Sequence, residues 1–428
     1  MKKVVTAGLY LSVLISSLLL SEAVDWPQFQ GDAINSGLAE SAVPEDPRIL
    51  WSCDLIRVDV PPIVADGSVY VLAGDGTLSS LDGETGDLRW EAQTEGWVFQ
   101  TSTPALAGGR ILAATDSGDL ASFDAQTGEE LWTRHLTDRR FEVPITCFDG
   151  LIYLGEGSGR GRGEKRYFCL DEDGEEVWNL SRDTTGYMGC GAAVAGDYLV
   201  YGSNDGLLLC VDRNTGDLSD ILNLSDGSRI GFAASDPGRI RASVSYKDGS
   251  VYTTSEFSAK RGYAWKVGFD EEDGTFENLG WSSSVGFSTS TPAVYDGRVY
   301  LGVGEHGYPG ALTCLDDCTG DLIWSYPVEA GVKSSPVISA AGESPRIVFT
   351  AARVNGSIYC IEDGGSEPRL LWRFDPQDDG YILAGAAVSE GRVYFGTEKG
   401  ILYCLSDPQA DPSENSTIKI EPTGGSTS

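Results

Sequence analysis

The sequence has few positive charges and very few histidines. Lys and Arg together number 31 against 64 Asp and Glu, which gives a formal net charge of −33 at pH 7. Such an acid excess repels the phosphate backbone of nucleic acids and the anionic surface of a membrane. The two histidines leave little room for imidazole-based metal sites or catalytic triads. Nucleic-acid binding and most histidine-dependent chemistry are therefore excluded.

Long apolar runs are missing everywhere except at the amino terminus. Lys2 and Lys3 precede an apolar stretch from Val4 to Leu20, and Ser21-Glu22-Ala23 ends on a small residue. This pattern predicts a signal peptide over residues 1–23 that is cleaved near Ala23. The alternative is an uncleaved anchor, although the run is short for spanning a bilayer. We expect a monomeric mature protein without a transmembrane segment, secreted or held at the cell surface.

The rest of the composition is that of a folded all-β protein. Apolar residues make up 41% and aromatic residues 10%, enough to build a core and unlike a disordered polyelectrolyte. The 54 glycines are about twice average usage and follow no collagen period. Glycine at this frequency indicates many tight turns.

One sequence unit recurs along the chain. Its first copy has strands at Ile63-Val64-Ala65 and Val69-Tyr70-Val71, a third strand ending in Asp82, a turn with Gly86, and an outer strand with Trp90. Similar copies follow at intervals of about 40 to 50 residues. Four short strands per period are typical of a β-propeller.

The ends of the chain indicate how the ring closes. The eighth copy ends with the strand Ile401 to Leu405 and has no outer Trp strand after it, whereas Arg48 to Trp51 resembles an outer strand and precedes the first copy. We expect this amino-terminal strand, at about 48–53, to pair beside Tyr403. The predicted fold is an all-β, eight-bladed propeller of four-stranded antiparallel blades over residues 24–406, closed by that strand.

The recurring residues have mechanical roles. Asp at the end of the third strand can accept backbone N–H groups in the turn, and the following Gly can adopt a positive φ. The outer-strand Trp should pack against the next blade, burying ~200 Å², in six copies: Trp51, Trp90, Trp132, Trp178, Trp324 and Trp372. Blade four has Asp220 in that slot and blade five has Asn278, with Trp281 three residues later. Those two blades are expected to pack less regularly.

These motifs resemble those of a known family. Ser80-Leu81-Asp82 with Gly86 and Trp90, repeated at Ser122-Phe123-Asp124, is similar to the docking motif of the PQQ-like, or quinoprotein-type, β-propellers. The opening Trp26-Pro27-Gln28-Phe29 resembles the usual lead-in of that family. The resemblance covers residues 26–406. It implies the fold, and for function it implies either a PQQ-dependent dehydrogenase or a non-catalytic scaffold of outer-membrane assembly.

The dehydrogenase branch is not expected here. By resemblance, its quinone lies between a Trp and a disulfide of adjacent cysteines, beside a calcium ion. No two cysteines are adjacent in this chain, the closest being Cys314 and Cys318, and there is no CxxCH haem site. We therefore expect no catalytic residues, no metal site and no cofactor, with PQQ and calcium as the alternative.

The nine cysteines predict free thiols. Five of them occupy the same third-strand slot in different blades, where the separation is too large for a disulfide: Cys169, Cys210, Cys314, Cys360 and Cys404. The other four allow no confident pairing. So many free thiols in an exported protein suggest an anaerobic host.

Topology points to one face of the ring as the binding surface. Loops from each outer strand to the next inner strand should surround the mouth of the channel, and they carry cations and aromatic residues: Arg57, Trp97, Phe99, Arg139, Arg140, Tyr187, Arg239, Arg241, Lys333 and Tyr381. One interpretation is that the arginines pair with Asp138, Glu142, Asp236 and Asp379 and stiffen the loops. The other is that the mouth captures a partner, with Arg for carboxylates and aromatic rings for apolar contact.

The sequence thus favours a non-catalytic scaffold that presents protein or peptide partners to one propeller face at the cell surface. The alternatives are a PQQ-dependent oxidoreductase and an envelope carbohydrate-binding module. Residues 407–428 are polar and rich in Pro, Ser and Gly, and we expect a flexible tail there.

Overall fold

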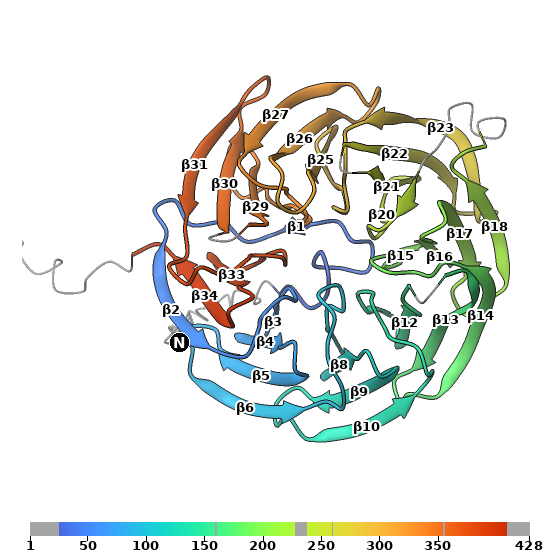
Figure 1. Cartoon of the computed structure of the whole chain (residues 1–428), viewed down its shortest axis with the longest axis horizontal. Coiled ribbons are helices and arrows are strands. Elements are labelled where there is room, and N and C mark those ends of the chain that lie inside the picture. Colours follow the sequence, from blue (N-terminus) through green and yellow to red (C-terminus); the bar gives the residue numbers. More distant parts are fainter. Residues whose placement is uncertain (1–24, 159–160, 227–237, 259, 354–355, 409–428) are drawn as a thin grey trace, which may run out of the picture.

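The protein is an eight-bladed β-propeller, as predicted (Figure 1). The computed structural model describes residues 25–158, 161–226, 238–258, 260–353 and 356–408. These described residues contain no helix, and so none that could cross a membrane. The predicted signal peptide and nearly all of the predicted tail lie outside them.

Each blade is one antiparallel sheet that runs from an inner strand at the channel to an outer strand at the rim. Blade one contains β3 (Ile63–Ala65), β4 (Ser68–Leu72), β5 (Thr77–Asp82) and β6 (Leu88–Gln93), and blade two contains β7 (Ala105–Ala107), β8 (Arg110–Ala114), β9 (Asp119–Asp124) and β10 (Glu130–His135). Blade three contains β11 (Thr146–Phe148), β12 (Leu151–Gly155), β13 (Gly163–Asp171) and β14 (Glu176–Thr184), and blade four contains β15 (Ala193–Ala195), β16 (Tyr198–Gly202), β17 (Leu207–Asp212) and β18 (Leu218–Asn223). Blade five contains β19 (Arg239–Ile240), β20 (Ser245–Lys247), β21 (Ser250–Ser258), β22 (Arg261–Asp270) and β23 (Thr275–Ser284), and blade six contains β24 (Ala293–Tyr295), β25 (Arg298–Val303), β26 (Gly310–Asp316) and β27 (Leu322–Val328). Blade seven contains β28 (Val337–Ser339), β29 (Arg346–Ala351), β30 (Ser357–Asp363) and β31 (Pro368–Phe374), and β1 (Leu38–Ala39) pairs beside its inner strand β28. The last contains β32 (Ala387–Ser389), β33 (Arg392–Gly396), β34 (Ile401–Ser406) and β2 (Arg48–Asp54).

Burial along the strands explains their sequences. The second strand of a blade is covered on both faces by neighbouring blades, so β4 is buried at every position. The outer strand β6 alternates between exposed and half-buried residues because only one face meets the next blade. Continuous apolar runs therefore form the middle strands, and alternating patterns form the rim.

The predicted closure by the amino-terminal strand is confirmed. Strand β2 pairs antiparallel with β34, with Trp51 opposite Cys404 and Ser52 opposite Tyr403. The first strand of the ring therefore completes the last blade, and no blade is left with a missing outer strand.

The amino-terminal segment 26–39 also crosses the middle of the ring, which was not predicted (Figure 1). It makes backbone hydrogen bonds to the inner strands of several blades, among them the Trp26 N–H to the Val64 carbonyl and the Ile338 N–H to the Gly37 carbonyl. The buried Asn35 amide donates to the carbonyls of Ala192 and Val244, at 2.8 and 2.7 Å. This crossing segment ties opposite sides of the ring together.

The Trp and Gly positions of successive blades meet. A Cβ on Gly128 would lie 2.5 Å from the Trp90 ring, and the Trp90 indole N–H donates to the Ala125 carbonyl at 3.0 Å. The turn acids act within their own loops, since Asp124 Oδ1 accepts the N–H groups of Gln126 and Thr127. These hydrogen bonds lower the pKa of the Asp124 carboxyl.

Blade five differs from our expectation of irregular packing. Trp281 lies against Gly320 and donates its indole N–H to the Asp317 carbonyl at 2.9 Å, the same contacts that Trp makes elsewhere. A register break in β23, where Val267 pairs with Gly280 but Gly268 pairs with Glu277, shifts Trp281 into the docking position. The docking contact of blade five is therefore regular, contrary to expectation, although the strand pairing that supplies it is irregular.

Blade four has no docking Trp. Asp220 occupies the slot opposite Cys210, and its Oδ2 accepts the N–H of Phe276 in the next blade at 2.9 Å. The ring of Tyr198, rather than an indole, lies against Gly274. A hydrogen bond and a phenol ring thus replace the indole between blades four and five.

Replacing Gly128 by alanine tests the docking contact. Gly128 and Gly109 lie in the same blade with φ of 73° and 75°, but a Cβ on Gly109 would meet nothing within 4 Å. Gly109→Ala carries the backbone strain alone, whereas Gly128→Ala also drives a methyl group into Trp90. We expect Gly128→Ala to lower the free energy of unfolding by about 1–3 kcal/mol more than Gly109→Ala does. Urea denaturation of both variants measures this difference, and equal losses would contradict it.

All nine cysteines are free thiols in the structure. Seven are buried, Cys53 is half-buried and Cys318 is exposed. Burial raises the pKa of the Cys147, Cys169 and Cys404 thiols to about 12. The buried side chains therefore act as small core residues rather than nucleophiles.

Alkylation of the native protein tests this assignment. With iodoacetamide at pH 8 we expect rapid labelling of Cys318, slower labelling of Cys53, and labelling of the other seven only after unfolding, because the thiolate is the reactive form. Peptide mass spectrometry on protein purified without oxygen gives the order and the total of nine thiols. Disulfide-linked peptides accounting for most cysteines would overturn the assignment.

Candidate functional site

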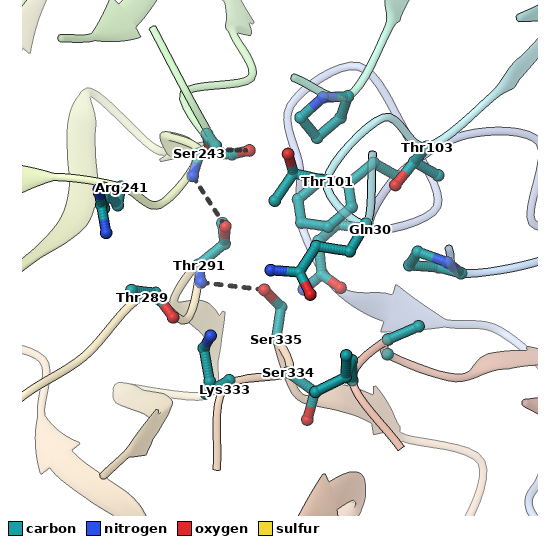
Figure 2. Close-up of a pocket in the computed structure, with 18 of the residues that line it drawn as sticks. Gln30, Thr101, Thr103, Arg241, Ser243, Thr289, Thr291, Lys333, Ser334 and Ser335 are labelled. Carbon is teal, nitrogen blue, oxygen red and sulfur yellow. Dashed lines mark hydrogen bonds between the residues drawn. The ribbon is translucent and has the colours of Figure 1, made fainter. Parts of the chain in front are cut away.

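One end of the channel is built from equivalent positions in all eight blades. The residue two places before each inner strand faces the axis: Pro61, Thr103, Pro144, Gly191, Ser243, Thr291, Ser335 and Gly385. All but Gly191 line one pocket, which we call the axial pocket (Figure 2). The repeat therefore places one side chain or backbone turn from each blade around the same opening.

The crossing segment forms the floor of the axial pocket. Trp26, Phe29 and Gln30 line it from below, and Gln30 is held by a hydrogen bond from its Nε2 to the Pro336 carbonyl at 3.1 Å. The pocket has a volume of about 130 Å³. Its walls include the apolar residues Met188, Phe287 and Leu383 from the loops at the mouth. The axial pocket therefore lies between the crossing segment and the loops of the mouth face.

A chain of hydrogen bonds organises the polar wall. The Gly191 N–H donates to Ser243 Oγ at 3.1 Å. The Ser243 N–H donates to Thr291 Oγ1 at 3.0 Å, and the Thr291 N–H donates to Ser335 Oγ at 2.9 Å (Figure 2). Each hydroxyl oxygen accepts an amide hydrogen from the preceding blade. These bonds fix the side chains and leave the hydroxyl hydrogens of Thr291 and Ser335 without an acceptor among the described residues.

Two cations complete the axial pocket, and both were predicted site residues. Arg241 and Lys333 are the charged residues of its described lining, and Figure 2 shows them on the same side, with Thr289 between them. Arg241 pairs with Glu256 at 3.6 Å, and its buried Nε has no partner among the described residues. Burial lowers the pKa of Lys333, and the charge of Arg241 lowers it further.

Most other cations of the mouth are neutralised by buried acids. Arg57 contacts Asp59 at 2.5 Å, Arg139 contacts Glu156 at 3.3 Å, and Arg140 contacts Glu142 at 3.4 Å. All three carboxylates are buried. This matches the interpretation that arginines stiffen the loops, although only Glu142 was among the predicted partners. Asp138 contacts His135 instead, and Asp236 lies outside the described residues.

A second feature of the mouth is an exposed apolar cluster at blades eight, one and two. Arg57, Trp97 and Phe99 line a shallow pocket, and the Trp97 side chain is 62% exposed. Ile56, next to Arg57 in the chain, is 59% exposed. Two hydrogen bonds hold this loop: the Trp97 N–H donates to Asp116 Oδ1 at 2.9 Å, and the Asp116 N–H donates to the Trp97 carbonyl at 2.8 Å. We call Ile56, Arg57, Trp97 and Phe99 the Trp97 patch.

The remaining predicted residues are scattered. Tyr187 is fully buried, because it packs against the stacked rings of Tyr167 and Tyr201, so it cannot contact a ligand at the mouth. Arg239 is exposed at the start of β19. Tyr381 stacks on His306, with 4.7 Å between ring centroids.

Two parts of the site were missed from the sequence. One is the floor from the crossing segment, and the other is the hydroxyl chain. The recurrence of Ser or Thr just before the inner strands, as in Thr103-Pro104, Thr291-Pro292 and Ser335-Pro336, is a repeat signal that could have indicated the hydroxyl chain.

The calcium–quinone arrangement of the dehydrogenases does not fit this pocket. Calcium in proteins is held mainly by carboxylate and carbonyl oxygens, whereas the described lining contains no carboxylate. No cysteine lines the pocket, and the described residues contain no group of three His, Cys, Asp or Glu that could hold a metal ion. The lining instead combines two cations, Ser and Thr hydroxyl groups, the Gln30 and Gln100 amides, and apolar side chains.

Comparisons with known proteins agree with the fold. A family model described as outer membrane protein assembly factor BamB matches residues 41–219, 96–266 and 247–351, which together span 41–351. The structure resembles BamB from Moraxella catarrhalis, with a TM-score of 0.61 and 17% identity over 84% of this chain and 98% of that one. It also resembles quinohemoprotein alcohol dehydrogenase from Comamonas testosteroni, with a TM-score of 0.65 and 13% identity over 91% of this chain and 81% of that one. No curated protein matched the chain.

Proposed function

Because this chain belongs to the PQQ-like β-propeller family whose model is described as outer membrane protein assembly factor BamB, we propose that it is a non-catalytic scaffold of the cell envelope. In this proposal it binds protein or peptide partners on the mouth face. The predicted signal peptide supports export to that location. The poor fit of the axial pocket to calcium and quinone argues against the dehydrogenase alternative.

The Trp97 patch is the observation that carries the proposal. A tryptophan that leaves 62% of its side chain exposed forfeits most of the apolar burial available to it. Here it lines one pocket with the half-buried Phe99 and with Arg57, whose guanidinium is also paired with Asp59. Exposed Trp, aromatic and Arg side chains in one cluster are the residue types that dominate protein–protein binding energy.

Site-specific crosslinking in the native host tests this function. A photoreactive phenylalanine analogue at position 97 should crosslink one defined envelope protein, identified by mass spectrometry. The matched control places the same analogue at Gln126, in an exposed Asp–Gly turn on the opposite face. Arg57→Glu should remove most of the crosslink at position 97.

Several outcomes would contradict the proposal. Crosslinks only from position 126, or none to a defined protein from position 97, would exclude the mouth face as the docking surface. Binding to envelope glycans that is lost in Trp97→Ala, without a protein crosslink, would instead establish the carbohydrate-binding alternative.

A further inference from the structure

The axial pocket is a site built for an anion, in a protein whose net charge is −33. Arg241 and Lys333 line it together, and no carboxylate among the described residues shares the lining. Lys333 has no hydrogen-bond or ion-pair partner among the described residues, and it is half-buried. Glu256 pairs with Arg241 at 3.6 Å, and the charges of Glu305 and Glu256 act on Lys333, but neither carboxylate lines the pocket. The two cations repel each other there, and a bound anion relieves that repulsion.

Two hydroxyl groups of the pocket can donate to a ligand, whereas those of Thr101, Ser243 and Ser334 already donate to backbone carbonyls. Thr291 and Ser335 each use their oxygen to accept a backbone N–H, at 3.0 and 2.9 Å. Neither hydroxyl hydrogen has an acceptor among the described residues, so both are available to a ligand in the pocket. A wall of O–H donors beside two cations binds acceptor-only groups, and carboxylates are the commonest such group in proteins.

The rest of the pocket suits an apolar body behind the charged head. Trp26 and Phe29 form the floor, and Met188, Phe287 and Leu383 lie in the walls. A free inorganic anion would leave these apolar surfaces without a contact. A carboxylate attached to an apolar side chain would use both parts of the lining.

We infer that the axial pocket binds the C-terminal carboxylate of a partner polypeptide whose last side chain is apolar. The carboxylate lies between Arg241, Lys333 and the Thr291 and Ser335 hydroxyls, and the apolar side chain lies on the Trp26 floor. This inference rests on the proposed function, because the pocket opens on the same face as the Trp97 patch. It deepens that function by specifying the chemistry of the partner segment.

Calorimetric titration of the full mature chain at low ionic strength tests the inference. The probes are N-acetyl-Ala-Phe with a free carboxylate, the same dipeptide as its C-terminal amide, and inorganic phosphate. We expect the free acid to bind at least about tenfold more tightly than the amide, and more tightly than phosphate. Equal affinity for acid and amide, or a preference for phosphate, would overturn the inference.

Variants assign the effect to the pocket. Lys333→Gln should weaken binding of the free acid about tenfold, and it leaves no buried group unpaired because Lys333 has no partner among the described residues. Lys333→Arg should restore most of the affinity. The control Lys399→Gln removes an exposed cation from the loop between β33 and β34, outside the lining of the pocket and outside the Trp97 patch, and should leave binding of the dipeptide unchanged. An unchanged affinity in Lys333→Gln would also refute the assignment.

The two proposals can fail separately. A crosslink from position 97 with no acid preference in the pocket would eliminate only the carboxylate site. A carboxylate-specific pocket with no partner at position 97 would eliminate the scaffold proposal and leave a receptor for small carboxylates.

Discussion

Replacing Trp51 by alanine should lower the free energy of unfolding by about 3–5 kcal/mol, the range measured when a buried aromatic side chain is truncated. Trp51 lies in β2, the strand that closes the ring, and only 8% of it is exposed. Its ring contacts Tyr394 within blade eight, and its indole N–H donates to the Gly83 carbonyl of blade one at 3.1 Å. One side chain therefore holds the closing strand and joins the last blade to the first.

Trp97→Ala provides the matched control, because it removes the same side chain from an exposed position of the mouth. We expect its free energy of unfolding to stay within about 0.5 kcal/mol of the parent protein. Equilibrium unfolding in urea, followed by far-UV circular dichroism, measures both variants. Similar stabilities for Trp51→Ala and Trp97→Ala would show that β2 contributes little to closing the ring.

Asn35→Ala should be the second most damaging substitution, lowering the free energy of unfolding by about 2–5 kcal/mol. The Asn35 amide donates to Ala192 of blade four and Val244 of blade five from a position that is 3% exposed. Alanine leaves the buried Val244 carbonyl without this donor, while the Ala192 carbonyl keeps the Thr146 hydroxyl at 3.0 Å. A buried carbonyl that loses its donor costs its desolvation free energy, and the Asn35 side chain also leaves a gap in the crossing segment.

Asn214→Ala is the control for this change. Asn214 is exposed in a turn, where its backbone N–H donates to Asp212 Oδ1 at 2.9 Å, a bond that alanine retains. Its stability should be nearly unchanged. If Asn35→Ala proved equally mild in chemical denaturation, the crossing segment would not be a structural tie across the ring.

The repeat made the blades and their closure predictable. Residues close in the sequence identify the strands of a blade: a Gly turn, the Asp that ends the third strand, and the Trp of the outer strand. The missing outer strand of the last blade and the spare strand near Trp51 could be matched by pattern alone. The number of residues between the Gly turn and the outer strand identified the wrong docking position only in blade five. There the register break in β23 moves Trp281 beyond the expected slot.

The crossing segment could not be predicted in the same way. Its contacts join Gln28, Gln30 and Asn35 to carbonyl groups far away in the sequence, and no local pattern identifies those partners. The same limit applies to the mouth. Glu156 follows the second strand β12, and Glu256 lies near the end of the second strand β21. Both reach arginines of other loops, so sequence neighbours identified only the Arg140–Glu142 pair correctly.

Prediction of the candidate site was correspondingly uneven. Topology placed Arg241 and Lys333 at the channel, because every loop from an outer to an inner strand ends there. Topology could not distinguish Arg241 and Lys333 from Tyr187, which lies in a similar loop. The Tyr187 ring is buried in the core, where it packs against the stacked rings of Tyr167 and Tyr201. Which loop residues reach the axis depends on packing between blades.

Closure by the amino-terminal strand also sets the order of folding. Strand β2 is made early in synthesis, yet its partner β34 is among the last segments of the propeller to emerge. Pairing between segments so distant in the chain is intrinsically slow. Until then, the exposed edge of β34 and the unattached β2 are free to pair between molecules, so exchange of this strand between two chains is the characteristic misfolding route of such a ring.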